Sequence, residues 1–214
     1  MKQRVLGRTG FSVSEVSLGA WQMGGVKYGM VSGQAADPIL SEYLDRGGNF
    51  IDTAHAYDES EVRIGHFLRN HAVRDRVIVA SKTHQLEEPE IRRDLEHSLS
   101  AMGRDCIDLY YLHAPPAEPD QMVRTLDVFE RLKAEGKIGA IGASIKGPNV
   151  ISETAELSRK YIDKGKVDVL MLIYSILRQD NERSIALAGA ANVGVVFKDT
   201  VFARSYRGER TRRA

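Results

Sequence analysis

Short apolar runs alternate with longer amphipathic segments over most of this 214-residue chain. Each apolar run has the length of a strand. Each segment that follows has apolar residues three or four positions apart, which is typical of a helix. Repeated strand–helix units predict a parallel sheet with right-handed crossovers. The predicted strands cover residues 16–19, 49–53, 77–81, 107–112, 138–143, 167–174 and 193–197, and the predicted helices cover 35–45, 60–70, 90–102, 120–135, 148–163 and 181–191.

The same spacing predicts which side chains face the core and how the chain begins. Before the first unit, the turn-rich residues 7–10 separate the apolar residues 5–6 and 11–13, which predicts a short N-terminal hairpin. The expected inward residues are Ile39, Leu40, Tyr43 and Leu44 in the first helix and Val62, Ile64, Phe67 and Leu68 in the second.

The strand pattern favours a closed barrel over an open sheet. The strands are almost continuously apolar, as strands buried on both faces are. No strand is followed by the glycine fingerprint of an open dinucleotide-binding sheet, and polar residues end strand after strand at the same edge. We therefore expect a (β/α)8 TIM barrel in one domain over residues 1–214. A typical barrel has about 250 residues, so we expect an incomplete one of about seven strands that lacks the last βα portion.

Composition narrows the class of protein without identifying it. Hydrophobic residues make up 43% and charged residues 28%, as in ordinary globular domains. No apolar run approaches the roughly 20 residues that span a bilayer, and the N-terminus lacks a signal-peptide core, so we expect a cytoplasmic protein with no membrane contact. The single cysteine, Cys106, is expected to pack as a small hydrophobe.

Charge is concentrated at one end of the chain. The net charge is +1, yet residues 204–214 hold five arginines against one glutamate. We expect this basic tail, over about 203–214, to be solvated. No basic stripe interleaved with aromatic residues occurs elsewhere, so no nucleic-acid partner is expected.

Four titratable residues lie at or just beyond the ends of three successive strands: Asp52, Tyr57, Lys82 and His113. In a parallel barrel these ends meet at one mouth, where catalytic residues lie. Lys82 would make the Tyr57 phenol a stronger acid, and Asp52 would pair with Lys82. His113 would donate a hydrogen bond to an oxygen that gains negative charge. The set suits protonation of a carbonyl oxygen while a cofactor delivers hydride.

Several motifs together resemble the aldo-keto reductase family over nearly the whole chain. They are Leu6-Gly-Arg-Thr-Gly10, Val16-Ser-Leu-Gly19, Gly48-Asn-Phe-Ile-Asp-Thr-Ala-His-Ala-Tyr57, Ser81-Lys82, Tyr110-Tyr-Leu-His113 and Ile138-Gly-Ala-Ile-Gly-Ala-Ser144. The resemblance implies a (β/α)8 barrel, NADPH (or NADH) as cofactor and reduction of an aldehyde or ketone. It implies Asp52, Tyr57, Lys82 and His113 as the catalytic tetrad, with Tyr57 the proton donor. Asp52 would also border the cofactor, and Ser144 would bind the nicotinamide carboxamide.

The chain departs from the family pattern where the cofactor would bind. Ile145 stands where the family usually has Asn, and Met171 where Gln is common. Lys198 takes the place of an aromatic residue that often stacks on the nicotinamide, which makes it a cofactor-side candidate. The basic segment that grips the 2′-phosphate of NADPH after the eighth strand has no counterpart, and one hypothesis gives that task to the tail arginines.

Two alternatives remain open at this point. A metal-dependent barrel hydrolase could use Asp52, His55, His84 and His113 as ligands. However, no His-x-His ends the first strand and no His-Glu-x-x-His occurs, so we expect no catalytic metal. The second alternative is a non-catalytic or truncated relative that acts as a binding or oligomerisation module, because open sheet edges favour association into a homo-oligomer.

Overall fold

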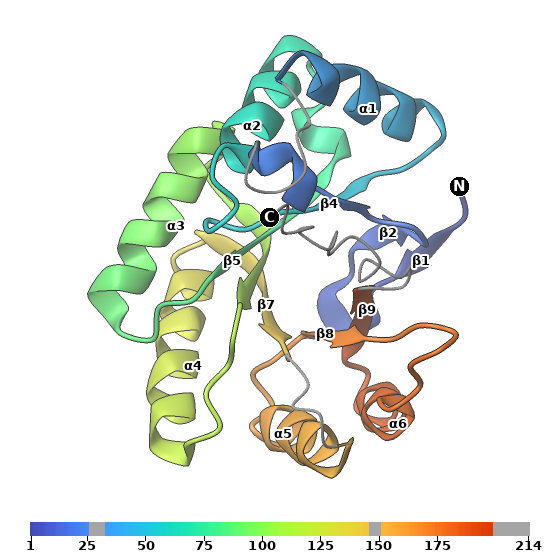
Figure 1. Cartoon of the computed structure of the whole chain (residues 1–214). Helices are drawn as coiled ribbons and strands as arrows, with labels where there is room; N and C mark the ends of the chain where they lie inside the picture. Colours follow the sequence, from blue (N-terminus) through green and yellow to red (C-terminus); the bar gives the residue numbers. More distant parts are fainter. Residues whose placement is uncertain (26–32, 146–150, 199–214) are drawn as a thin grey trace, which may run out of the picture.

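The computed structural model describes residues 1–25, 33–145 and 151–198. A two-stranded antiparallel hairpin, β1 (Gln3–Val5) and β2 (Ser12–Ser14), precedes a seven-stranded parallel sheet in the order β3 to β9 (Figure 1). The strands of this sheet are β3 (Leu18–Gly19), β4 (Phe50–Asp52), β5 (Ile78–Thr83), β6 (Ile107–Leu112), β7 (Ile138–Ser144), β8 (Val169–Ile173) and β9 (Gly194–Lys198).

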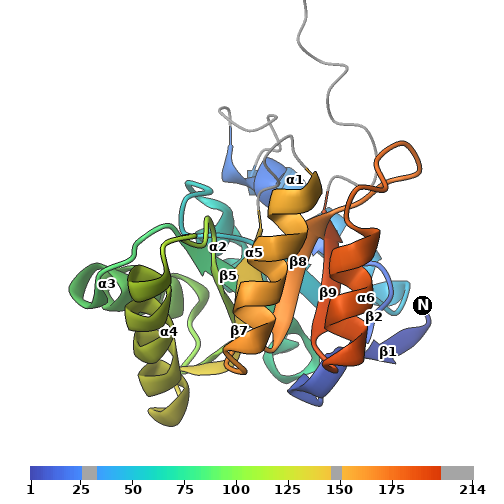
Figure 2. The same cartoon turned by 90° about the horizontal axis from the view of Figure 1, so that it is seen from below.

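Six helices connect the strands and cover the outer face of the curled sheet. They are α1 (Gly33–Asp45), α2 (Ser60–Asn70), α3 (Glu88–Met102), α4 (Pro119–Ala134), α5 (Ile151–Asp163) and α6 (Glu182–Ala190). Figure 2 shows α5 and α6 against β8 and β9 on this outer face. The result is the incomplete (β/α)8 barrel with an N-terminal hairpin that the sequence predicts, with seven parallel strands and six intervening helices.

Alternation along each strand divides the core into two layers. On β6, Leu109 and Tyr111 belong to an inner apolar cluster, whereas Tyr110 and Leu112 belong to an outer cluster shared with the helices. Both sets are almost fully buried, which explains the continuous apolar runs. A residue's parity along a strand therefore decides whether its side chain enters the barrel or faces the helices.

The N-terminal segment is fixed to the ends of β8 and β9 that lie away from the strand-end titratable residues. Arg8 donates to Asp168 and to the carbonyl oxygens of Gly165 and Val167. Asp168 also accepts from Lys133 at 2.6 Å. Gly7, at a φ of +51°, lies so close to β9 that a Cβ atom would overlap the backbone of Gly194.

A second glycine sets the spacing of α2 and α3. A Cβ atom at Gly65 would overlap the carbonyl oxygen of Ala101. Its absence lets the two helices approach closely, and side chains from both helices then meet above β5.

Some sequence-based details are wrong. Val62 and Ile39 are 49% and 38% exposed rather than inward, because each lies too far around its helix from the buried residues such as Ile64 and Leu40. Glu61 is buried instead of Val62. The hairpin pairs residues 3–5 with 12–14, because the 3-10 turn Gly7–Thr9 lies between the strands.

Three further points concern the limits of the elements. The first barrel strand is shorter than predicted, at Leu18–Gly19. The start of the helix predicted at 148 and the basic tail lie outside the described residues. Across residues 1–25, 33–145 and 151–198, no helix is both long and apolar enough to cross a membrane.

Candidate active site

The alternation of side chains along each strand places the strand-end residues inside the barrel. Asp52 lies two positions after the inward Phe50, and Lys82 lies two after the inward Ala80. His113 follows the inward Tyr111 by the same interval. Because the strands are parallel, all three side chains point inward at the carboxyl-terminal edge. All three line one cavity of about 1240 Å³ together with Tyr57.

Lys82 is the centre of this group. Its side chain is 1% exposed, and its Nζ donates to Asp52 Oδ2 at 2.8 Å and to the carbonyl oxygen of Thr53 at 2.5 Å. Burial lowers the pKa of Lys82 below its usual value, and the Asp52 carboxylate opposes that shift. A buried ammonium is thus held by one carboxylate and one carbonyl oxygen.

Tyr57 and His113 lie beside this ammonium. Lys82 Nζ is 5.0 Å from the centre of the Tyr57 ring. The Tyr57 and His113 rings meet edge to face at 5.7 Å, and His84 stacks on His113 at 4.0 Å. The turn between β4 and α2 carries Tyr57, whose backbone N–H donates to the carbonyl oxygen of Ala54. The structure therefore brings together the phenol, ammonium, carboxylate and imidazole.

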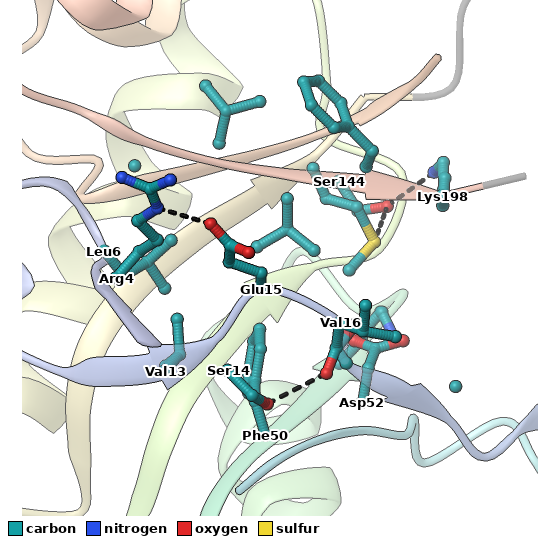
Figure 3. Close-up of a pocket in the computed structure, with 18 of the residues that line it drawn as sticks. Arg4, Leu6, Val13, Ser14, Glu15, Val16, Phe50, Asp52, Ser144 and Lys198 are labelled. Carbon is teal, nitrogen blue, oxygen red and sulfur yellow. Dashed lines mark hydrogen bonds and ion pairs between the residues drawn. The ribbon is translucent and has the colours of Figure 1, made fainter. Parts of the chain in front are cut away.

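Ser144 and Lys198 come from strands on another wall of the cavity. Lys198 Nζ donates to Ser144 Oγ at 2.8 Å, and Ser144 Oγ donates to Met171 Sδ at 3.6 Å (Figure 3). A thioether sulfur is a weak acceptor. Ser144 thus has a hydroxyl hydrogen that a carbonyl oxygen of a ligand could accept more strongly.

Asp52 has a second oxygen that faces the same interior. Its Oδ1 is buried and has no hydrogen-bond partner among the described residues. The nearby phenol of Tyr111 is fully buried, and burial raises its pKa well above the usual value, with the Asp52 charge adding to the shift. Tyr111 is therefore a neutral residue buried beneath the site, with its ring centre 6.0 Å from Lys82 Nζ.

The metal-hydrolase ligand set does not form. The exposed His84 stacks on His113 but does not line the cavity, whereas His55 faces Glu61 and Asp94 outside the barrel. Within the described residues, the one group of at least three ligand atoms at metal-binding spacing is His55, Glu61 and His97. None of these three lines the cavity.

Sequence reasoning missed the polar residues that lie behind the mouth. Ser81 donates to Glu61 at 2.5 Å, and Thr83 donates to Asp94 at 2.5 Å. Both donors alternate with Lys82 on β5 and so face the helices. The segment Ala80-Ser81-Lys82-Thr83 could have indicated these residues. Neighbouring side chains on a strand point to opposite faces, so consecutive polar residues predict polar partners on both faces of β5.

Comparison with known proteins gives this barrel a family. The model of the aldo/keto reductase family matches residues 15–213. The seven-stranded parallel sheet, with a helix after each strand but the last, is the architecture of a (β/α) barrel. The chain belongs to the aldo/keto reductase family.

Individual relatives agree with this membership. The uncharacterized oxidoreductase YqkF of Bacillus subtilis is 30% identical over 94% of this chain and 65% of its own length. The NADH-specific methylglyoxal reductase of Escherichia coli is 31% identical over 86% of this chain and 62% of its own length. An aldo/keto reductase of Klebsiella pneumoniae, solved with NADP and acetate, is 26% identical with a TM-score of 0.76 over 93% of this chain and 68% of that chain. The chain thus spans less than two thirds of the length of the two curated relatives.

Proposed function

We propose that this chain reduces an aldehyde or ketone to an alcohol with NADPH or NADH, with Tyr57 as the proton donor. The observation that carries the proposal is the position of the Lys82 ammonium, which pairs with Asp52 at 2.8 Å and lies 5.0 Å from the Tyr57 ring centre. In general, a cation within about 4–6 Å of a phenol hydroxyl favours the phenolate and makes the phenol a better acid.

Each member of the tetrad has a separate task in this proposal. Tyr57 transfers its hydroxyl proton to the carbonyl oxygen, and the phenolate that remains is stabilised by Lys82. Asp52 keeps Lys82 charged and oriented against the cost of burial. His113, edge to face with Tyr57, directs the substrate oxygen towards the phenol. When bound, the nicotinamide supplies the hydride that reaches the carbonyl carbon.

The residues on the opposite wall suit a nicotinamide. Ser144 Oγ donates only to the sulfur of Met171, a weak acceptor that a carboxamide oxygen could replace. Lys198 lies beside Ser144 and would place a positive charge near the cofactor. Asp52, on the other side, has the free oxygen Oδ1 described above. We assign cofactor contact to Ser144, Lys198 and Asp52.

The choice between NADPH and NADH is tested by binding. The E. coli relative is named NADH-specific, whereas the Klebsiella relative was solved with NADP. We propose NADPH as the preferred cofactor, with NADH as the alternative. Titration of protein fluorescence with each cofactor measures the two affinities directly.

Three further expectations from the sequence stay predictions. They are a cytoplasmic location, the absence of nucleic-acid partners and the formation of a homo-oligomer.

The decisive experiment is substitution of the proton donor. Tyr57→Phe removes one hydroxyl, so we expect turnover of a carbonyl panel, followed by loss of NADPH absorbance, to fall about 10²- to 10⁴-fold. Cofactor affinity should stay within about twofold. The matched control is Tyr161→Phe on α5, whose hydroxyl donates to the carbonyl oxygen of Pro116 outside the cavity.

Two results would overturn the proposal. Tyr57→Phe with wild-type turnover would remove Tyr57 as the acid. Wild-type protein that binds neither cofactor would favour the alternative of a non-catalytic binding or oligomerisation module. Cofactor binding without reduction of any carbonyl in the panel would contradict the reductase activity alone.

A further inference from the structure

A second polar cluster lies outside the barrel, between the β4–α2 turn and helices α2 and α3. His55 belongs to the turn, Glu61 to the first turn of α2, and His97 to the middle of α3. One ligand atom from each lies within 4.8 Å of the others. The close approach of α2 and α3 at Gly65 makes this meeting possible.

Glu61 is the buried member of the cluster. It is 1% exposed, and Ser81 donates to its Oε1. Its Oε2 faces His55 Nδ1 at 3.9 Å and His97 Nδ1 at 3.8 Å, both too long for a hydrogen bond. A buried carboxylate oxygen thus has two imidazole nitrogens around it and a direct hydrogen bond from neither.

Among the described residues the cluster has no lysine or arginine in direct contact, and the Lys82 ammonium, on the inner face of β5, acts on Glu61 only at longer range. Asp94 is buried next to it and accepts from Thr83. Among the described residues, no lysine or arginine forms an ion pair with Glu61 or Asp94. Two buried carboxylates without such a partner are costly unless a positive charge joins them. One divalent cation would neutralise both.

His55 is oriented for metal binding. Its Nε2 faces Asp94 Oδ1 at 3.5 Å, so the carboxylate favours the tautomer with the proton on Nε2. Its Nδ1 is buried, has no hydrogen-bond partner among the described residues, and points at Glu61 Oε2. A carboxylate behind an imidazole is the usual arrangement around a metal-ligating histidine.

We propose that His55, Glu61 and His97 bind one zinc-type divalent metal ion through His55 Nδ1, His97 Nδ1 and Glu61 Oε2. Metal–ligand bonds of about 2.0–2.2 Å in a tetrahedron place ligand atoms roughly 3.4 Å apart. The three ligand atoms lie within 4.8 Å of one another, so the widest pair has to close by up to about 1.4 Å to reach this spacing, and the side chain of His97 is exposed enough to move. Ser81 and Asp94 orient Glu61 and His55, and solvent supplies the fourth ligand.

The bound ion would connect the turn that carries Tyr57 to α3. The backbone N–H of His55 donates to the carbonyl oxygen of Lys82, so the same turn is already joined to the barrel. An ion that binds only the folded state raises the melting temperature with its concentration. None of its ligands lines the cavity, so metal binding can be measured separately from the proposed reductase activity.

The test uses untagged protein stripped with a chelator and then desalted. We expect calorimetric titration with Zn²⁺ to show one site per chain, and Co²⁺ to give the visible absorption of a four-coordinate ion. His97→Ala should weaken Zn²⁺ affinity more than 100-fold, and Asp94→Asn, which loses only an orienting group, about 10- to 100-fold. His66→Ala is the matched control, because its imidazole lies exposed on α2 and bonds Asn70.

Three outcomes would overturn the site. They are absence of one-to-one binding in the wild type, unchanged affinity in His97→Ala, and an equal loss in His66→Ala. Folding does not confuse the result, since His97 is 57% exposed and circular dichroism checks each variant.

Discussion

Two polar clusters lie on opposite faces of β5, and they differ in how their charge is balanced. Inside the barrel, the Asp52 carboxylate meets the Lys82 ammonium at 2.8 Å. Outside, Glu61 meets two imidazoles at 3.8 and 3.9 Å with no direct hydrogen bond. The inner carboxylate is in direct contact with an ammonium, whereas among the described residues no lysine or arginine forms an ion pair with the outer carboxylate. The comparison suggests that the inner group works with charges supplied by the chain, whereas the outer group requires an ion from solution.

The largest expected effect comes from breaking the inner pair. Asp52→Ala leaves the Lys82 ammonium buried, with the Thr53 carbonyl oxygen as its remaining described acceptor. Removing one partner of a buried pair typically costs about 3–5 kcal/mol of unfolding free energy. Urea denaturation at neutral pH measures the loss.

The double variant shows whether charge or packing causes that loss. Asp52→Ala with Lys82→Met leaves no charged member of the pair, so most of the lost stability should return. If the double variant is as unstable as Asp52→Ala, the cost comes from packing rather than from the unpaired ammonium.

A smaller effect follows from the lowered pKa of Lys82. The folded protein releases this proton at a lower pH than the unfolded chain, whose value is 10.5. Between the two values the unfolded state holds more protons, so the free energy of unfolding rises with pH. Below the lowered pKa the cost of burying the charge is present in full, and it is gone above 10.5.

Comparison with Lys82→Met isolates this contribution from other groups. The stability advantage of the wild type over Lys82→Met should increase from neutral pH towards 10.5, as measured by denaturation at several pH values. A difference that is constant or falls with pH would mean that the Asp52 charge outweighs burial. That result would contradict the direction of the pKa shift.

The strand–helix pattern was enough to predict the barrel, and strand-end position was enough to predict which inner residues meet. Asp52, Lys82 and His113 could be found because parallel strands end at one edge and parity sets their face. The burial of Glu61 could not be predicted, because charged residues on a helix are usually solvated. The sequence pattern predicted the apolar Val62 beside it as the inward residue. The burial of Glu61 depends on Ser81 and on the close approach of α2 and α3, both set by tertiary packing.

The smallest expected effect is the most informative about the outer cluster. Glu61→Gln keeps an oxygen that accepts from Ser81 but removes a charge that forms no direct ion pair with a lysine or arginine among the described residues. In chelator at neutral pH, we expect the free energy of unfolding to change by no more than about 1 kcal/mol. With saturating Zn²⁺, the difference in unfolding free energy between the wild type and Glu61→Gln should increase, because only the wild type is stabilised by metal binding. A loss of about 3 kcal/mol in chelator would instead mean that His55 and His97 already act as the cations, and the outer cluster would then be balanced in the same way as the inner one.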